Sequence, residues 1–385
     1  MAVVVGHFGV DVLNSSGAVL LAALAGSLAL SNAQIGLALT WYTLAGSLSQ
    51  PLFGWFADRT HQRPGLLGGL GLVWMALGFS AVAFAQNWAL LLPCFVLAAL
   101  GSGLFHPIGT ANAAVAHPTR AGSATAVFFF CGQLGLALGP VLTGLLYRAG
   151  GGLGVLALCI AMFVPVGLLV TVPRVQAVAA TAKGAARRAA VQAGWFVLGS
   201  FVLLVALRSS IQAVYAAFLP KLFADRGWDT AAYGLLAGTF MLTAAIGNLV
   251  TGTLADRYGM RVATVPPLLL GVPAGLLCLW APTPATAFVA SGLAGLLLGG
   301  QHSVLVVHAQ RLIPAGQGFA AGLILGFTFA AGAIGTWLCG ISADYWGLLA
   351  AMQVITLLGV PAALLALTLP GRKRAMIQPA VEANV

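Results

Sequence analysis

The sequence predicts an all-α membrane protein with twelve transmembrane helices in two pseudo-symmetric six-helix bundles. Hydrophobic residues make up 60% of the 385 residues and charged residues only 6%, so most of the surface must face lipid. Apolar stretches of about 20 residues, the length that spans a bilayer as a helix, recur along the chain. The segment 35–59 is nearly repeated at 233–257, at a constant offset of 198 residues. A membrane chain in two similar halves is typical of transporters that move one half against the other.

The expected membrane spans fall into two sets of six, separated by a basic, Ala-rich segment at 174–194. This segment has the composition of a linker, so residues 1–173 form the expected N-terminal bundle and residues 195–370 the C-terminal bundle, followed by a tail at 371–385. In chain order, the expected spans are 5–30, 35–57, 65–86, 88–115, 121–148 and 153–173, then 195–220, 230–255, 263–281, 285–311, 317–343 and 347–370. An even number of spans places both termini on the side of the linker.

The repeat continues further along the chain, at an offset of 196 residues. The corresponding pairs are His106 and His302, Asn112 and His308, Pro118 and Pro314, Gly139 and Gly335, and Gly144 and Gly340. Chance similarity between apolar, Gly-rich helices explains a matching glycine or two, but it does not readily explain polar residues that keep register in two separate segments. The two bundles are therefore expected to be structural copies of each other.

The net charge of +10 is distributed in the pattern that orients membrane proteins. The basic residues gather in alternate loops, the linker and the tail, and few lie in the loops of the other face. We therefore expect the linker and both termini to be cytoplasmic, and we do not expect a nucleic-acid partner. The five cysteines are scattered through apolar stretches without metal-ligand or redox spacing, so no metal centre is expected there.

Two loops at corresponding positions carry Gly, Asp and Arg in a pattern that suits a conformational latch. They read GWFADRTHQR at 54–63 and GTLADRYGMR at 252–261. A carboxylate and arginines at a helix end can join two helices in one conformation and release them in another, while Gly252 permits close approach of a neighbouring helix and Gly259 a tight turn. The expected latch residues are Gly54, Asp58, Arg59, Gly252, Asp256, Arg257 and Arg261. The pattern resembles the loop motif of the major facilitator superfamily.

The fifth span contains GQLGLALGP, in which Gly132, Gly135 and Gly139 form a thin face for helix packing and Pro140 removes a backbone donor. This motif is similar to the glycine-proline motif of antiporters in that superfamily. The segments HFGVDVLN at 7–14, GLFHP at 103–107 and HAQRLIP at 308–314 further resemble its fosmidomycin-resistance branch. The resemblance implies the major facilitator fold, a bacterial inner-membrane location and drug export. Arg311 departs from that pattern, because the branch carries an acidic residue there.

Seven ionisable side chains fall within the expected spans or near their ends, where charge is costly and therefore suggests function. They are His7, Asp11, His106, Arg208, His302, His308 and Arg311. In the superfamily fold, the first, fourth, seventh and tenth helices line a central cavity, and all seven residues fall on those helices. We expect proton coupling by Asp11, the one carboxylate inside a span, together with His106 and its counterpart His302. His7 has the simpler alternative of a residue near a helix end.

Asp11 and Arg208 come from equivalent helices of the two halves, so they are candidates for an ion pair across the cavity. One interpretation makes Asp11 the proton carrier, with Arg208 favouring proton release whenever the two approach. The alternative is a static salt bridge that holds the halves in register. We favour the first, because a static pair would block alternating access.

The expected cavity has one acid against two arginines and up to four histidines, which favours an anionic or zwitterionic solute. The candidate substrate contacts are Arg208, His308, Arg311, Asn14, Asn112, Tyr42, Gln133 and Gln212. For the histidines, structural hydrogen bonding is the alternative, and for the aromatic residue it is packing. A metal site built from the histidines is weakly indicated, because no ligand spacing recurs with carboxylates.

These observations together predict a secondary transporter that exports a small organic solute in exchange for protons. An importer or a uniporter on the same fold is the alternative. No nucleotide-binding motif is present, so we expect no cofactor and a proton gradient as the driving force. A membrane enzyme needs a constellation of catalytic groups at one depth, and the single intramembrane carboxylate does not provide one. The expected partners are a small-molecule substrate and the lipid bilayer, with the monomer as the working unit.

Overall fold

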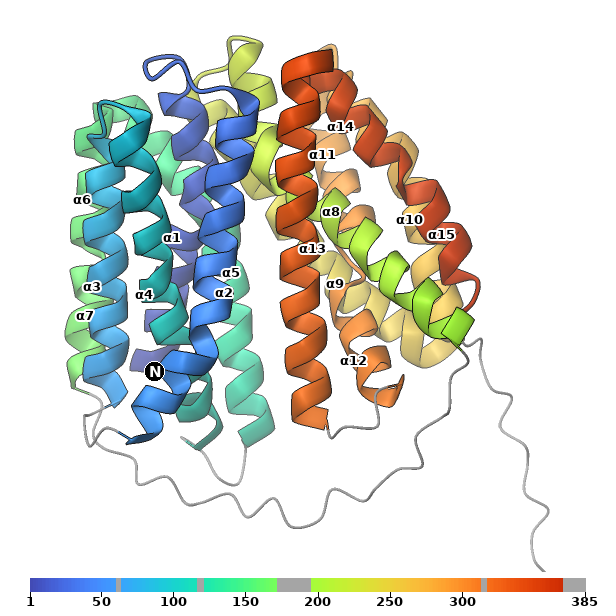
Figure 1. Ribbon diagram of the computed structural model, residues 1–385, viewed down its shortest axis with the longest axis horizontal. Coiled ribbons are helices and arrows are strands. Elements are labelled where there is room, and N and C mark those ends of the chain that lie inside the picture. The colour runs from blue at the N-terminus through green and yellow to red at the C-terminus, as the bar shows by residue number, and fades with distance from the viewer. Residues whose placement is uncertain (60–63, 116–120, 172–194, 313–316, 370–385) are drawn as a thin grey trace, which may run out of the picture.

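The computed structural model describes residues 1–59, 64–115, 121–171, 195–312 and 317–369. These residues form helices joined by short connections, in two bundles that lie side by side (Figure 1). The N-terminal bundle contains α1 (Ala2–Leu24), α2 (Asn32–Arg59), α3 (Pro64–Ala83), α4 (Trp88–Val115), α5 (Ala121–Gly150), α6 (Gly152–Ala161) and α7 (Phe163–Val170). The C-terminal bundle contains α8 (Trp195–Asp225), α9 (Thr230–Tyr258), α10 (Met260–Leu279), α11 (Pro284–Leu298), α12 (His302–Leu312), α13 (Gln317–Trp346), α14 (Leu348–Leu357) and α15 (Gly359–Ala366). The predicted linker and tail lie outside the described residues.

The helices correspond to the twelve expected spans, three of which are interrupted. Within the described part of the chain, eleven segments are long and apolar enough to cross a membrane. The twelfth expected span is α2, which is 28 residues long and carries more polar residues. Prolines account for two interruptions: Pro165 cannot donate to Ala161, where α6 ends, and Pro361 cannot donate to Leu357, where α14 ends. The third interruption, between α11 and α12, falls at Gly299 and Gly300.

The two bundles contact each other through α5 with α9 and through α2 with α13. We call the end where α7 finishes and α8 begins the linker side, and the opposite end the far side. The closest approach is on the far side, where a Cβ on Gly234 would lie 2.4 Å from the carbonyl oxygen of Pro140 and 3.1 Å from the Cα of Gly144. The backbones of α5 and α9 therefore touch, which only glycine allows at these positions.

Polar contacts between the bundles also lie on the far side. Asp344 at the end of α13 accepts hydrogen bonds from the N–H groups of Asn32 (2.8 Å) and Ala33 (3.0 Å) at the start of α2. Arg148 on α5 pairs with Asp229, the N-cap of α9, at 3.4 Å. Carboxylates at two helix N-termini thus help to join the halves, in accord with the helix dipole. Nearer the middle of the helices, the Thr40 hydroxyl on α2 donates to the Ala333 carbonyl on α13 at 2.7 Å. Among the described residues, the hydrogen bonds between the bundles therefore lie between the far side and the middle of the helices and none lies at the linker-side end, so the conformation is sealed on the far side.

The predicted latch on the linker side is not formed in this conformation. Arg59 stacks on the Trp55 ring, with its guanidinium carbon 4.2 Å from the ring centroid. Arg261 donates to the carbonyl of Leu369 at the end of its own bundle. Asp256 and Arg257 are exposed, and neither takes part in an ion pair with a described residue. The side chain of Asp58 lies outside the described residues. A latch between the bundles needs their linker-side ends to meet, and here the contacts are on the far side.

The glycines of the two latch loops behave differently from one another. Gly259 has φ of +90° and ends α9, as a tight turn requires. A Cβ on Gly54 would contact the Pro107 side chain at 3.4 Å, but one on Gly252 would have nothing within 4 Å. The prediction that Gly252 permits close helix approach is therefore wrong for this conformation. The close approaches of α9 lie at other glycines, at Gly234 against Pro140 of α5 and at Gly247 against Leu296 of α11, where an added Cβ would lie 2.4 Å and 2.3 Å from the carbonyl oxygens.

Candidate functional site

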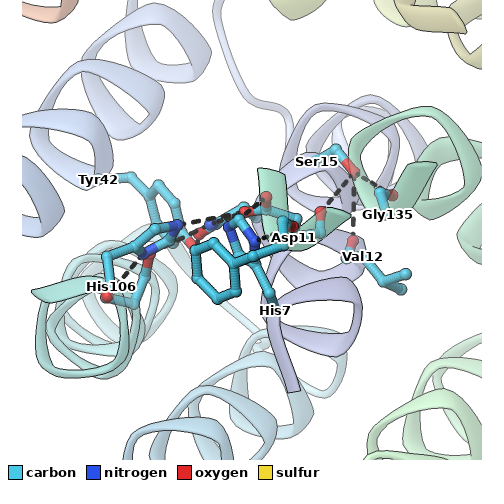
Figure 2. Close-up of polar contacts among 10 residues, drawn as sticks. His7, Asp11, Val12, Ser15, Tyr42, His106 and Gly135 are labelled. Atoms are coloured by element: carbon cyan, nitrogen blue, oxygen red, sulfur yellow. Dashed lines mark hydrogen bonds and ion pairs between the residues drawn. The ribbon is translucent and has the colours of Figure 1, made fainter. Parts of the chain in front are cut away.

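The described part of the chain has one buried ionised cluster, formed by His7, Asp11 and His106. His7 Nε2 lies 3.2 Å from Asp11 Oδ2, and His106 Nε2 lies 3.6 Å from Asp11 Oδ1. His7 and Asp11 come from α1 and His106 from α4, and Figure 2 shows both rings beside the carboxylate. His7 is 3% exposed and Asp11 6%. We call these three residues the acid–histidine cluster. The structure brings together Asp11 and His106, two of the three predicted proton-coupling residues, and adds His7, for which a position near a helix end was the simpler expectation.

Helix packing explains why these side chains meet. His7 and Asp11 are four residues apart, so they lie on the same face of α1. That face packs on the glycine face of α5, where a Cβ on Gly132 would lie 2.4 Å from the His7 ring and 2.6 Å from Asp11 Oδ2. One on Gly135 would lie 2.5 Å from the Phe8 carbonyl, and one on Gly139 2.3 Å from the Val12 carbonyl. The three glycines of the predicted thin face thus lie against α1, and Gly132 also makes room for the cluster itself.

Backbone carbonyls fix the orientation of both imidazole rings. His7 Nδ1 lies 2.8 Å from the Phe128 carbonyl oxygen, and His106 Nδ1 lies 2.9 Å from the Ser102 carbonyl oxygen. A carbonyl oxygen only accepts, so His7 Nδ1 must carry a proton and donate it. His106 Nδ1 also lies 3.2 Å from the Ser102 hydroxyl, and the shorter contact to the carbonyl favours the same tautomer for that ring. The Nε2 atoms of both rings are thereby left to face the same carboxylate. The His7 ring is also stacked on Phe128, with ring centroids 3.9 Å apart.

This orientation requires a proton between His7 and Asp11. With Nδ1 already donating, an unprotonated Nε2 beside an ionised Oδ2 at 3.2 Å would place two lone pairs against each other. Either the ring or the carboxyl group must therefore hold a proton that the two share. His106 faces the other carboxylate oxygen and can hold a second proton in the same way. The cluster is neutral with one shared proton and carries one positive charge with two.

A chain of neutral hydrogen bonds extends the cluster to α2. Asn14 Nδ2 donates to Asp11 Oδ1 at 2.8 Å and to Ser102 Oγ at 3.1 Å, while its Oδ1 accepts from the Tyr42 hydroxyl at 2.8 Å. Asn14 and Tyr42 were predicted as substrate contacts. Tyr42 is buried, stacked on Phe95 at a centroid distance of 4.6 Å. In this conformation Asn14 and Tyr42 hold Asp11 in place.

The C-terminal bundle buries Arg208 at the interruption between α11 and α12. Arg208 is 1% exposed, and its Nη2 donates to the Gly299 carbonyl at 2.5 Å. The same carbonyl accepts from Asn248 Nδ2 at 3.5 Å, and the Thr251 hydroxyl donates to the carbonyl of Gly300. Carbonyls freed by the interruption therefore have donors from α8 and α9, as irregular backbone inside a membrane requires.

The predicted ion pair between Asp11 and Arg208 is absent from this conformation. Among the described residues, the ionic partners of Asp11 are His7 and His106, and Arg208 has no carboxylate partner. The reason is local, since each charge finds its partners within its own bundle. Asp11 uses two imidazoles and an amide, whereas Arg208 uses a carbonyl at the C-terminal end of α11, where the helix dipole is negative.

The other predicted site residues are spread through both bundles. His302 begins α12, forms no ion pair with Asp11 and has its ring 6.4 Å from that of Phe329. His308 is buried beside Phe201, with ring centroids 5.1 Å apart. Asn112 is buried and donates to the Ile108 carbonyl of its own helix at 2.8 Å. The structure therefore does not gather these residues around Asp11.

Two further candidates make no hydrogen bond to another described residue, and the third is described only by its backbone. Gln133 is exposed on α5, and Gln212 is half-buried on α8. Arg311 belongs to α12, but its side chain lies outside the described residues.

The acid–histidine cluster also has the chemistry of a metal site. One ligand atom from each residue lies within 4.8 Å of the others, and two imidazoles with a carboxylate suit Zn²⁺. The separation of 3.2 Å between Nε2 and Oδ2 is equally that of two groups sharing a proton. We interpret the cluster as a proton site, because a shared proton satisfies both anchored rings without any further ligand.

Two helical bundles joined at one end, with buried charge in each, define a multi-pass membrane transporter. A family model described as the Major Facilitator Superfamily matches residues 3–210 and again residues 201–383. The chain therefore belongs to the major facilitator superfamily, whose members transport solutes and are not enzymes. The separate match to each half agrees with the internal repeat.

Individual relatives and structures support the same assignment. The chain is 28% identical over 358 residues to the uncharacterized MFS-type transporter YfnC of Bacillus subtilis, covering 90% of this chain and 87% of the relative. It is 27% identical over 322 residues to the fosmidomycin resistance protein of Escherichia coli, covering 81% and 78%. The fold is similar to that of a bacterial homologue of the human lysosomal transporter Spinster in an inward-facing and occupied conformation. That match has a TM-score of 0.79 and 15% identity, and covers 94% of this chain and 95% of the other.

Proposed function

We propose that this protein is a proton-coupled antiporter that exports a small anionic or zwitterionic organic solute by alternating access. The acid–histidine cluster carries the proposal. Asp11 is the only acidic residue that lies in the middle of a helix; Asp58, Asp225, Asp256 and Asp344 are at helix ends, Asp229 is an N-cap, and Glu382 lies outside the described residues. Ionisable groups inside a membrane are costly and mark ion pathways.

The geometry suits a group that gains and loses a proton during the transport cycle. One proton is shared between His7 and Asp11 in the described conformation, and His106 can accept a second. The His106 side chain is 22% exposed, against 3% for His7, so His106 is the member through which protons exchange with water. Imidazole gains and loses protons near neutral pH, as a carrier in a cell requires.

The sealed far side indicates that the described conformation opens toward the linker. The distribution of basic residues supports a cytoplasmic linker, and with that orientation this is the conformation that takes up cytoplasmic solute. Proton release here favours solute binding, and proton binding after the halves have moved favours solute release outside. The relative named as a fosmidomycin resistance protein supports export. We expect the monomer to suffice, because the acid–histidine cluster and both bundles lie within one chain.

The proposal is tested with purified protein in proteoliposomes that contain a pH-sensitive dye. Candidate solutes, including fosmidomycin, are added under an imposed pH gradient, and proton and solute movements are recorded together. We expect a solute to move protons in the direction opposite to its own. Movement in the same direction would indicate an importer, and solute flux without protons would indicate a uniporter; either result contradicts the proposal.

A further inference from the structure

Arg208 is a buried charge whose donors are mostly unused. It makes one hydrogen bond in the described structure, to the Gly299 carbonyl, and its buried Nε has no hydrogen-bond partner. A guanidinium group has five N–H donors in a fixed fork that matches a carboxylate or phosphonate. Burying such a charge without an acid to neutralise it is costly. The environment of Arg208 therefore lacks the anion that its chemistry calls for.

The interruption between α11 and α12 adds a second positive feature at the same place. Gly299, which accepts from Arg208, is three residues before His302, where the eleven-residue helix α12 begins. The first turn of a helix has N–H groups without intrahelical partners and a positive dipole end. Of these, the N–H of Ser303 donates to Asn248 Oδ1 at 3.2 Å. Interrupted helices whose N-termini lie within the membrane bind anionic substrate groups in other transporters.

Comparison of the two halves shows what is missing from the second one. His106 contacts Asp11 in the first half, and its counterpart at the 196-residue offset is His302, the first residue of α12. At the 198-residue offset the counterpart of Asp11 is Ser209, whose buried hydroxyl has no hydrogen-bond partner. Packing supports this alignment, because Gly139 approaches Val12 in the first half and Gly335 approaches Ser210 in the second. The second half thus keeps the histidine, adds an arginine and lacks the carboxylate.

We propose that the carboxylate or phosphonate group of the transported solute binds between Arg208 and the N-terminus of α12, where it supplies the anion that the second half lacks. This rests on the proposed function and assigns its two tasks to different halves, protons to the first and the anionic group to the second. His302 is half-buried and Ser303 exposed, so the solute reaches Arg208 past these residues. Because the guanidinium has free donors, the solute need not displace the Gly299 carbonyl.

Equilibrium binding to the full-length protein in lipid nanodiscs tests this site at constant pH and without a gradient. The probes are fosmidomycin, phenylphosphonate and benzoate, each paired with its neutral ester, and the readouts are calorimetry and thermal stabilisation. We expect at least one anion to bind more tightly than its ester, and Arg208→Gln to weaken that anion by roughly tenfold or more, as for a lost charged hydrogen bond. Arg208→Lys should retain part of the affinity. Arg226→Gln is the matched control, because Arg226 also donates to a backbone carbonyl, that of Leu279.

Three results would overturn the inference: no anion of the panel binds to the wild type, the esters bind as tightly as the anions, or Arg208→Gln binds like the wild type. The comparison of anions with esters uses unaltered protein, so it holds even if Arg208→Gln does not fold. Failure here is distinct from failure of the proposed function. If anions bind at Arg208 but transport does not depend on protons, the anion site is supported and the antiporter is not. If transport is coupled to protons but solute binding does not depend on Arg208, the antiporter is supported and the anion site is not.

Discussion

Replacing Asp11 by Asn is expected to abolish solute-driven proton movement while leaving solute exchange across the membrane intact. The amide has the size of the carboxyl group and can still accept from Asn14 and donate to His7, so the contacts of α1 are retained. It cannot take up or release a proton near neutral pH, and the cluster loses its negative charge. Exchange of labelled for unlabelled solute requires no net proton transfer, so it should continue. Net uptake driven by a pH gradient should fall to the level of empty liposomes.

Both activities are measured in the same proteoliposome preparation, with a dye inside for protons and labelled solute for exchange. Asp225→Asn controls for the loss of one carboxylate, because Asp225 pairs with Lys221 at the exposed end of α8. Proton movement of wild-type size in Asp11→Asn would show that the coupling group lies elsewhere. Loss of exchange as well as coupling would indicate instead that Asp11 has a structural role.

A Val at position 234 is expected to stop transport by preventing closure of the far side. Its Cβ would lie 2.4 Å from the Pro140 carbonyl oxygen, a distance that neither backbone can accommodate without separating α5 from α9. Overpacking of this kind costs about 1–3 kcal/mol, which shifts an equilibrium between two conformations roughly 5- to 150-fold. The protein should then favour the conformation that is open on the far side, and solute exchange should fall with it.

Distances between spin labels on the far-side ends of α5 and α9 report this shift directly. The separation should increase in Gly234→Val and remain unchanged in Gly199→Val. Gly199 is the matched control, because it is also a helical glycine in the C-terminal bundle but has nothing within 4 Å of its Cβ position. An unchanged separation with normal transport in Gly234→Val would show that the contact between these backbones is not required for closure.

The spans and the repeat could be predicted from sequence because they depend on features that act locally. Length and apolarity identify a membrane helix, and an offset between similar segments identifies two halves whatever their relative position. The glycines of α5 belong to the same kind of signal, since a face without side chains indicates close packing wherever its partner lies. The interruptions at Pro165 and Pro361 were not predicted, because we expected continuous spans there. The missing backbone donor of proline nevertheless accounts for both.

The contacts between charged groups could not be predicted in the same way. Asp11 and Arg208 looked like partners because each was the most costly charge of its half. Asp11 instead faces two imidazoles and an amide of its own bundle, whereas Arg208 has one backbone carbonyl and keeps unused donors. The importance of His7 was visible in its spacing of four residues from Asp11, which places both on one face of α1. The role of the Gly299 carbonyl as the acceptor for Arg208 could not be predicted. A pair of glycines in a Gly-rich membrane helix does not indicate that the helix ends there.

In the proposed cycle, solute and proton compete through Asp11. Calorimetric titration of the purified protein with its solute, in two buffers that differ in ionisation enthalpy, tests this competition. The difference between the two measured heats, divided by the difference between the ionisation enthalpies of the two buffers, gives the number of protons released on binding. We predict proton release of up to about one per solute from the wild type and none from Asp11→Asn, because a group that loses a proton on binding is lost in the variant. Identical heats in both buffers for the wild type, or equal proton release from Asp11→Asn, would contradict the account.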